Sequence, residues 1–238
     1  MSAAVVFEKV SIVFGNSPQE ALPLMDEGKS RSEVQTATDQ VLGVHNCSIE
    51  VEEGEILVLM GLSGSGKSTL LRAVNGLNKV VRGSVLINDG TGMTNITTAD
   101  PAKLREMRLH RVAMVFQQFG LLPWRDVMEN VAFGLELGGM PKKQREKKAR
   151  EQLELVGLSE WADRKVSELS GGMQQRVGLA RAFATEAPIL LIEHDMDAVF
   201  ALADRISVLV YGRIIATGSV DEIRNNPDVQ SAYLGEDA

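Results

Sequence analysis

The chain has 238 residues, of which 44% are hydrophobic, and it carries a formal net charge of −7 at pH 7. This length suits one domain with a sizeable core, and the acidic balance argues against broad binding to nucleic acid, which usually needs a basic surface. The single cysteine, Cys47, excludes an intrachain disulfide, as suits a reducing compartment. We expect no signal peptide and no membrane-spanning helix, because the apolar runs are far too short to cross a bilayer.

The first half of the chain predicts short strands and one polar insertion. Strands are expected at residues 5–14, 47–51, 55–60, 84–87 and 112–116. Residues 16–40 mix acidic and basic side chains and include two prolines, so we interpret them as a surface insertion that is partly helical. A helix is expected to begin near Lys67.

The second half predicts mainly helices, with one buried strand and a terminal hairpin. Helices are expected at residues 126–137, 142–156 and 174–185, and the strand at 189–192. Apolar residues then recur at helical spacing on one face of a short helix, at Met196, Val199, Phe200 and Ala203. A hairpin is expected from residues 207–211 and 214–217. Strands that alternate with helices favour a largely parallel sheet covered by helices.

A phosphate-binding pattern follows the third strand. Residues 61–68 read Gly-Leu-Ser-Gly-Ser-Gly-Lys-Ser, which fits G-x-x-x-x-G-K-[ST] between a strand and a helix. Glycines let the backbone turn its N–H groups toward phosphate oxygens, and the start of the helix adds unpaired N–H groups and a positive dipole end. The alternative is a glycine-rich turn before an ordinary helix. Roughly one chain in a hundred of this length would match the pattern by chance.

Each side chain of this loop has an expected role. Lys67 is expected to reach the β- and γ-phosphates of ATP, Ser68 to place its hydroxyl on Mg²⁺, and Thr69 to lie near the α-phosphate. The residues expected to bind nucleotide here are Gly61, Ser63, Gly64, Ser65, Gly66, Lys67, Ser68 and Thr69.

A second string narrows the protein class. Residues 169–176 read Leu-Ser-Gly-Gly-Met-Gln-Gln-Arg at the start of a predicted helix, and they resemble the signature of ABC transporter ATPases. The resemblance implies an α/β P-loop NTPase with a mainly parallel core sheet, an antiparallel β subdomain and a helical subdomain. It places the helical subdomain at about residues 118–180 of a single domain that spans residues 1–238.

The same resemblance implies a head-to-tail dimer. In that arrangement, the signature of one copy closes over the γ-phosphate held by the P-loop of the other. The signature residues that it assigns to nucleotide are Ser170, Gly171, Gly172 and Gln174. A serine-glycine helix cap would explain Ser170 alone, not the whole string.

Three residues between or before these motifs match further positions of the family. Gln117, after the strand at 112–116, is expected to contact Mg²⁺ or the attacking water, although a glutamine there also suits an ordinary surface position. Phe14 is expected to stack on adenine, or else to be a buried strand residue. The region around Trp124 resembles the part that binds a transmembrane permease, while Trp124 would equally suit a core.

The subfamily resemblance changes along the chain. Up to about Leu190, the insertion and the motifs resemble ATPases of choline and glycine betaine importers, whereas the tail resembles those of branched-chain amino-acid importers. The resemblance implies ATP and Mg²⁺ as ligands, permease subunits and a second copy of the chain as partners, and a peripheral position on the cytoplasmic face of the inner membrane. It implies no nucleic-acid partner, and we interpret the basic residues at 142–150 as a solvated helix face.

The sequence departs from the family after the strand at 189–192. The usual Asp-Glu pair and the D-loop are absent, and the strand runs directly into Glu193-His194-Asp195, so the core is expected to lack one strand and one helix. A junction is expected near residues 190–193. Either Glu193 takes the place of the magnesium-bridging acid and His194 that of the catalytic base, or His194 is the switch histidine and no base exists.

Three function classes therefore stay open. The first is an ATPase that powers transport. The second is a subunit that binds ATP but hydrolyses it poorly, acting only as a binding or interaction module. The third, an ABC ATPase outside transport, is disfavoured by the permease-binding region.

Overall fold

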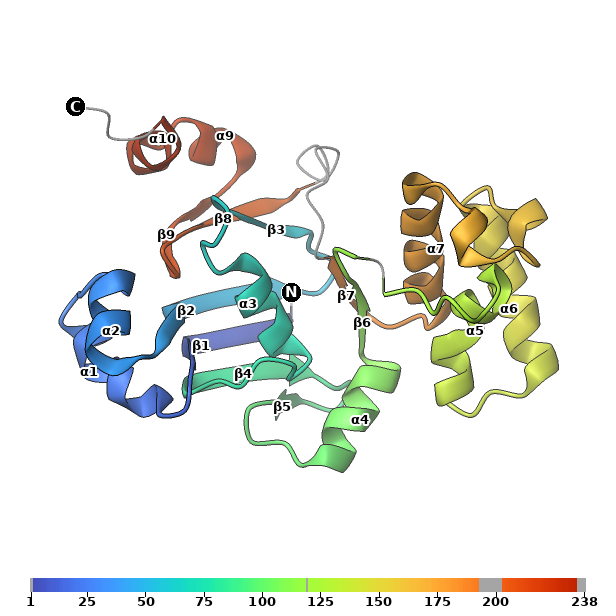
Figure 1. The fold of residues 1–238 in the computed structure, drawn as a ribbon, viewed down its shortest axis with the longest axis horizontal. Coiled ribbons are helices and arrows are strands. Elements are labelled where there is room, and N and C mark those ends of the chain that lie inside the picture. Colours follow the sequence, from blue (N-terminus) through green and yellow to red (C-terminus); the bar gives the residue numbers. More distant parts are fainter. Residues whose placement is uncertain (1, 119, 193–202, 235–238) are drawn as a thin grey trace. The chain divides into compact units, whose positions relative to one another are not determined.

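The computed structural model describes residues 2–118, 120–192 and 203–234 (Figure 1). The described residues up to 100 and from 203 onward form one compact unit, and those from 101 to 192 form the second. Within the described residues, no helix is both long enough and apolar enough to cross a membrane.

An antiparallel sheet forms the larger part of the first unit. Its strands, in spatial order, are β2 (Val41–Glu52), β1 (Ala3–Phe14), β4 (Arg82–Asn88) and β5 (Met93–Asn95). The second strand is much longer than the predicted 47–51, because β2 pairs with β1 from Phe14↔Val41 to Ala3↔Glu52. Cross-strand pairing along all of β1 extends β2 into residues that have little strand signal of their own.

The insertion folds into two short helices beside this sheet. After a 3-10 turn at Pro18–Glu20 come α1 (Ala21–Asp26) and α2 (Arg31–Thr38), which Figure 1 shows at one end of β1 and β2. Ser30 caps α2 in a capping box with Glu33, which satisfies backbone N–H groups at the start of the helix. The prediction of a partly helical insertion therefore agrees with the structure.

A second sheet in this unit leads to the P-loop. It contains β3 (Leu57–Met60), β8 (Arg205–Val210) and β9 (Arg213–Gly218), with β3 parallel to β8 and β8 antiparallel to β9. The helix α3 (Lys67–Val74) follows β3, and α9 (Val220–Arg224) and α10 (Pro227–Leu234) follow β9. The predicted hairpin forms, but its turn lies one residue earlier than expected, at Tyr211 and Gly212, which both have positive φ.

The second unit is mainly helical. Its elements are α4 (Pro101–His110), β6 (Val112–Val115), α5 (Val127–Leu137), α6 (Lys142–Leu155), α7 (Gly171–Ala184) and β7 (Ile189–Ile192), with 3-10 turns at Ser159–Trp161 and Val166–Glu168. Helices α5, α6 and α7 share one apolar core that includes Val131, Leu153 and Val177. Helix α4 was not predicted, because it buries only Met107 and lacks a clear apolar stripe.

Parallel pairing is divided between two separate sheets. Strand β3 pairs with β8 in the first unit, and β6 pairs with β7 in the second. Among the described strands, β7 has no other neighbour than β6. The helix predicted around Met196–Ala203 and the residues Glu193 and His194 lie outside the described residues, apart from Ala203 itself.

Candidate nucleotide-binding site

The loop at residues 61–66 joins β3 to α3 and requires glycine at two positions. Gly61 has a φ of +152° and Gly66 a φ of +108°, which side chains other than glycine rarely tolerate. A Cβ on Gly61 would lie 2.3 Å from the carbonyl oxygen of Leu209, and one on Gly66 would lie 2.8 Å from that of Gly43. The loop is therefore packed tightly against the chain beneath it, and its shape depends on both glycines.

The start of α3 is available for an anion. Gly66 is the N-cap residue and supplies no side-chain cap, so the first N–H groups of the helix rely on other partners. The ammonium group of Lys67 donates hydrogen bonds to the carbonyl oxygens of Gly61 and Leu62, the latter at 3.1 Å. Lys67 therefore bends over the loop, where phosphate oxygens would compete for its protons.

Ser65 contributes a hydroxyl that has no hydrogen-bond partner among the described residues. The residue is 5% exposed, and its Oγ atom is buried without a hydrogen bond. A buried hydroxyl in this state costs roughly 1–3 kcal/mol, so such groups usually have a partner. A phosphate oxygen in the loop would supply one. The orphaned hydroxyl, the glycine-dependent loop and the helix start together fit a phosphate-bearing ligand.

Phe14 lies beside the same loop. It ends β1 and is 43% exposed, so the alternative of a buried strand residue is wrong. A Cβ on Gly43 would lie 2.9 Å from the Phe14 ring and 3.0 Å from the methyl group of Thr69. Gly43 therefore lies between the aromatic ring and the first turn of α3. The structure brings together the residues predicted for the base and for the phosphates, with Ser63 and Gly64 exposed at the tip of the loop and Ser68 half-buried in α3.

Gln117 lies in the second unit, on an exposed turn after β6. The turn is held from α7, where the guanidinium group of Arg181 donates a hydrogen bond to the carbonyl oxygen of Gly120 at 2.8 Å. Burial lowers the pKa of Arg181 below its ordinary value. The glutamine side chain is thus presented on a loop that is anchored to the signature helix.

The signature residues form the start of α7. Ser170 is the N-cap residue and accepts a hydrogen bond from the N–H group of Met173 at 3.4 Å. Gly171 and Gly172 are exposed, and a Cβ on either would meet nothing within 4 Å. Gln174 donates through its amide nitrogen to the carbonyl oxygens of Val166 and Leu169, so it also braces the preceding turn. The front of this helix is open to a ligand or a second protein.

The described residues hold no group of three or more His, Cys, Asp and Glu side chains that suits a metal ion. The predicted magnesium ligands divide between Ser68 in the first unit and Gln117 in the second. Glu193 and His194 lie outside the described residues. Within the first unit, Ser68 offers a hydroxyl, which suits a metal that is bound mainly through phosphate oxygens.

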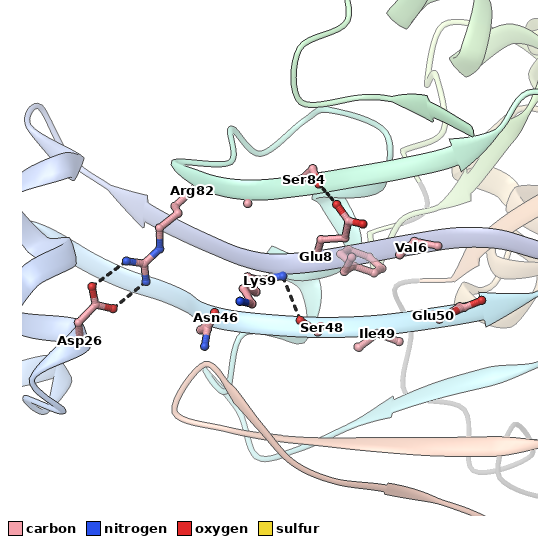
Figure 2. A pocket seen from close by; sticks show the side chains of 12 residues that line it. Val6, Glu8, Lys9, Asp26, Asn46, Ser48, Ile49, Glu50, Arg82 and Ser84 are labelled. Atoms are coloured by element: carbon pink, nitrogen blue, oxygen red, sulfur yellow. Dashed lines mark hydrogen bonds and ion pairs between the residues drawn. The ribbon is translucent and has the colours of Figure 1, made fainter. Parts of the chain in front are cut away.

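A groove of about 1010 Å³ lies on another face of the first unit, over β1, β2 and β4 (Figure 2). Three of the charged residues that line it, Asp26, Arg82 and Glu8, already have partners within the chain. Asp26 and Arg82 form a bidentate ion pair at 2.7 and 2.8 Å, and Ser84 donates to Glu8 at 2.5 Å. We therefore assign the candidate site to the P-loop rather than to this groove.

Sequence reasoning missed one residue at the loop. Arg31, the first residue of α2, donates hydrogen bonds to backbone carbonyl oxygens of the P-loop and of β2. A charged side chain within a polar insertion carries no signal of such a contact, because 33 residues separate it from Gly64 in the chain.

Comparison with known proteins gives two family matches. A family model described as ABC transporter matches residues 44–194, and one described as branched-chain amino acid ATP-binding cassette transporter matches residues 213–238.

Individual relatives are ATP-binding proteins of transport systems. The glycine betaine/proline betaine transport system ATP-binding protein ProV of Escherichia coli is 41% identical over 248 residues, covering 90% of this chain and 61% of the relative. The trimethylamine N-oxide transport system ATP-binding protein TmoW of Ruegeria pomeroyi is 38% identical, covering 90% of this chain and 72% of the relative. This chain thus spans about three fifths of the length of the first relative.

The fold also matches solved structures. A dimeric ATP-binding cassette in a post-hydrolysis state, bound to ADP and Pi, has 25% sequence identity and a TM-score of 0.73. The match covers 91% of this chain and 98% of that one.

Proposed function

The chain belongs to the ABC transporter family, and we propose that it is the ATP-binding subunit of an importer for a quaternary amine such as glycine betaine or choline. The observation that carries the ATP site is the loop at residues 61–66. Its backbone requires Gly61 and Gly66, its lysine bends over it, and its buried Ser65 hydroxyl has no partner in the part of the chain that the structure describes.

ATP would contact side chains from several elements of the first unit. Phe14 would stack on adenine, Lys67 would hold the β- and γ-phosphates, and Thr69 would lie near the α-phosphate. Ser68 would supply a hydroxyl to Mg²⁺, which would help to offset the negative charge of the phosphates. The chain's contribution is then to hold the phosphates in place and to offset their negative charge.

The proposed cargo rests on the names of relatives. Those names include glycine betaine, proline betaine and trimethylamine N-oxide, which share a positively charged nitrogen with four substituents. The cargo itself would touch other subunits, because the described part of this chain has no membrane-spanning helix.

We place the permease contact in the second unit. Trp124 is 70% exposed, so the alternative that it is a core residue is wrong. Exposed aromatic side chains are frequent at protein interfaces. A permease bound there would hold the chain at the cytoplasmic face of the membrane, and a second copy would face the open front of α7.

A second candidate function is ATP binding with poor hydrolysis. It is favoured by the residues after β7, where no Asp-Glu pair follows Ile192. The match to the Escherichia coli relative extends over 248 residues, more than the 238 of this chain, so the relative contributes residues that have no counterpart here. A missing catalytic segment would produce that difference.

Substitution of Lys67 by alanine tests the ATP site. We expect Lys67→Ala to weaken Mg-ATP binding by at least about 2 kcal/mol, or about 30-fold, because a charge-assisted contact to the phosphates is lost. Isothermal titration calorimetry with purified protein measures this directly. Phosphate release, followed on the same preparations, separates a working ATPase from a subunit that only binds.

Lys79→Ala is the matched control, since Lys79 is exposed and lies beyond the end of α3. It removes the same charge and should leave ATP affinity unchanged. Equal affinities in the wild type, Lys67→Ala and Lys79→Ala would place the nucleotide elsewhere.

A further inference from the structure

The insertion is docked onto the first unit by an apolar cluster. The cluster joins side chains from β1, the two helices of the insertion and β2, namely Val13, Ala21, Met25, Val34 and Leu42. Ala21, Met25 and Val34 have no exposed surface. Burial of this kind favours one fixed position for α1 and α2 on the sheet.

Polar contacts fix the same position. Asp26 at the end of α1 pairs with Arg82 and hydrogen-bonds His45 at 3.0 Å (Figure 2 shows the Asp26–Arg82 pair). Arg213 donates to the carbonyl oxygen of Met25 at 3.0 Å. These contacts hold the insertion but do not touch the P-loop.

Arg31 is the residue of the insertion that reaches the nucleotide site. One guanidinium nitrogen donates to the carbonyl oxygen of Gly64, in the P-loop. The other donates to the carbonyl oxygen of Gly43 at 2.9 Å and makes a longer contact of 3.5 Å to that of Ser65. Since Gly43 lies between Phe14 and Thr69, this one side chain touches both the base side and the phosphate side of the site.

These contacts orient the backbone of the loop. The carbonyl group of Ser65 belongs to the same planar peptide unit as the N–H group of Gly66, and the two point in opposite directions. The carbonyl oxygen of Ser65 accepts hydrogen bonds from Arg31 and from the N–H group of Gly212, the latter at 2.8 Å. The N–H group of Gly66, on the other side of the same peptide unit, therefore points away from the insertion. A backbone held this way loses less freedom when phosphate binds.

The guanidinium group also adds positive charge beneath the loop. In the part of the chain that the structure describes, Arg31 pairs with no carboxylate, and its buried Nε atom has no hydrogen-bond partner. Burial lowers its pKa below the ordinary value. A partly desolvated cation with only carbonyl partners is less stable than one in water, and an anion in the loop would offset part of that cost.

We propose that Arg31 is a positioning residue for ATP, which ties the base side of the site at Gly43 to the phosphate side at Gly64 and Ser65. The insertion thereby serves as a brace for the nucleotide site. The inference rests on the proposed ATP site and goes beyond it, because it assigns a role to the insertion.

The test compares two substitutions of Arg31 whose side chains are of similar length. We expect Arg31→Met, which keeps the apolar stem and removes the donors, to weaken Mg-ATP binding about tenfold, in the range of one or two lost charge-assisted hydrogen bonds. Arg31→Lys keeps a charged donor and should lose no more than about threefold. Calorimetry gives the affinities, and thermal unfolding without nucleotide verifies that each variant is folded. If Arg31→Met does not fold, Arg31→Gln takes its place.

Arg213→Met is the matched control, because it removes an arginine that holds the insertion without touching the P-loop. It should bind ATP within about twofold of the wild type, an expectation for a site without a shared partner. Wild-type affinity in Arg31→Met, an equal loss in Arg31→Lys, or an equal loss in Arg213→Met would each overturn the proposal. If the wild type binds ATP and Lys67→Ala does not, any of those results refutes the role of Arg31 alone, whereas a wild type that fails to bind ATP refutes the site itself.

Discussion

At the scale of single residues, Cys47 is linked to the P-loop through the backbone of Gly212. Its thiol donates to the carbonyl oxygen of Gly212 at 3.2 Å, and the N–H of Gly212 donates to the carbonyl oxygen of Ser65 at 2.8 Å. Cys47 is 1% exposed, and burial raises the pKa of its thiol to about 11. The one thiol of the chain is therefore both shielded and neutral at physiological pH.

We predict slow labelling of Cys47 in the native protein. With the pKa raised from 9.0 to about 11, the reactive thiolate at pH 8 is about 100-fold scarcer than in the unfolded chain, before any steric shielding. The same shift favours the neutral thiol, so its contribution to stability is complete below pH 9.0 and declines as the pH rises toward 11. Reaction with a disulfide reagent at pH 8, with and without urea, measures the ratio. Equal rates in the two conditions would contradict the buried position.

At the scale of elements, the middle of α7 is buried while its first residues are exposed. Val177 and Ala180 are fully buried in the core of the second unit, while Gly171 and Gly172 are exposed with free space in front of them. Apart from the backbone of the helix itself, a Cβ at either glycine would thus meet nothing within 4 Å. Substitutions there test an interface without disturbing the fold that presents it.

Gly172→Asp is expected to abolish ATP-dependent dimerisation. Its carboxylate would face the γ-phosphate held by the second copy, and like charges repel strongly where water is excluded. Binding of ATP to the monomer and the unfolding temperature should stay at wild-type values. Light scattering with and without Mg-ATP measures the dimer.

The matched control is Gly92→Asp, an exposed glycine of the first unit whose Cβ would also meet nothing within 4 Å. It should dimerise like the wild type. ATP-dependent dimers that persist in Gly172→Asp would exclude the signature from the interface.

At the scale of the whole molecule, the parallel strands are shared between two sheets. β3 pairs with β8 and β6 with β7, and among the described strands β7 keeps one edge without a partner. Strand Ile189–Ile192 leads directly to Glu193 and His194, which lie outside the described residues. In the sequence, Glu193-His194-Asp195 follows this strand directly, without an Asp-Glu pair.

We predict that this chain hydrolyses ATP about 10²–10⁴-fold more slowly than an intact relative, the usual cost of losing a positioned general base. In the proposed site the P-loop, Ser68 and Gln117 would supply binding and metal contacts, but a histidine in place of the base carries no negative charge. Phosphate release is followed over time on protein shown to bind ATP, with Lys67→Ala as the blank and the Escherichia coli relative as the reference.

Release at the rate of the reference would refute the impairment. In that case, loss of activity in Glu193→Gln would assign the acid to Glu193, and loss in His194→Ala would assign the switch to His194. Release equal to the blank would favour the subunit that only binds ATP.

Most elements, and the loop at the centre of the site, could be read from the sequence because their signals are local. The pattern at residues 61–68 needs only glycines, a lysine and a serine at fixed spacing between a strand and a helix, and the structure has β3 and α3 at those places. The signature string likewise begins at a helix start, because Ser170 is a good N-cap residue. Helical spacing also predicted α5 and α6.

The tertiary structure decided what depends on residues far apart in the chain. The length of β2 comes from its pairing with β1. Gly61 packs closely against the carbonyl oxygen of Leu209, which is far away in the sequence. Arg31 reaches Gly64 because the insertion is docked beside the P-loop. Neither the orphaned hydroxyl of Ser65 nor the guanidinium group beneath the loop has a local signature. Burial and hydrogen bonding are properties of the packed neighbourhood, so a pattern read along the chain can name the residues of a site but not the contacts that hold them in position.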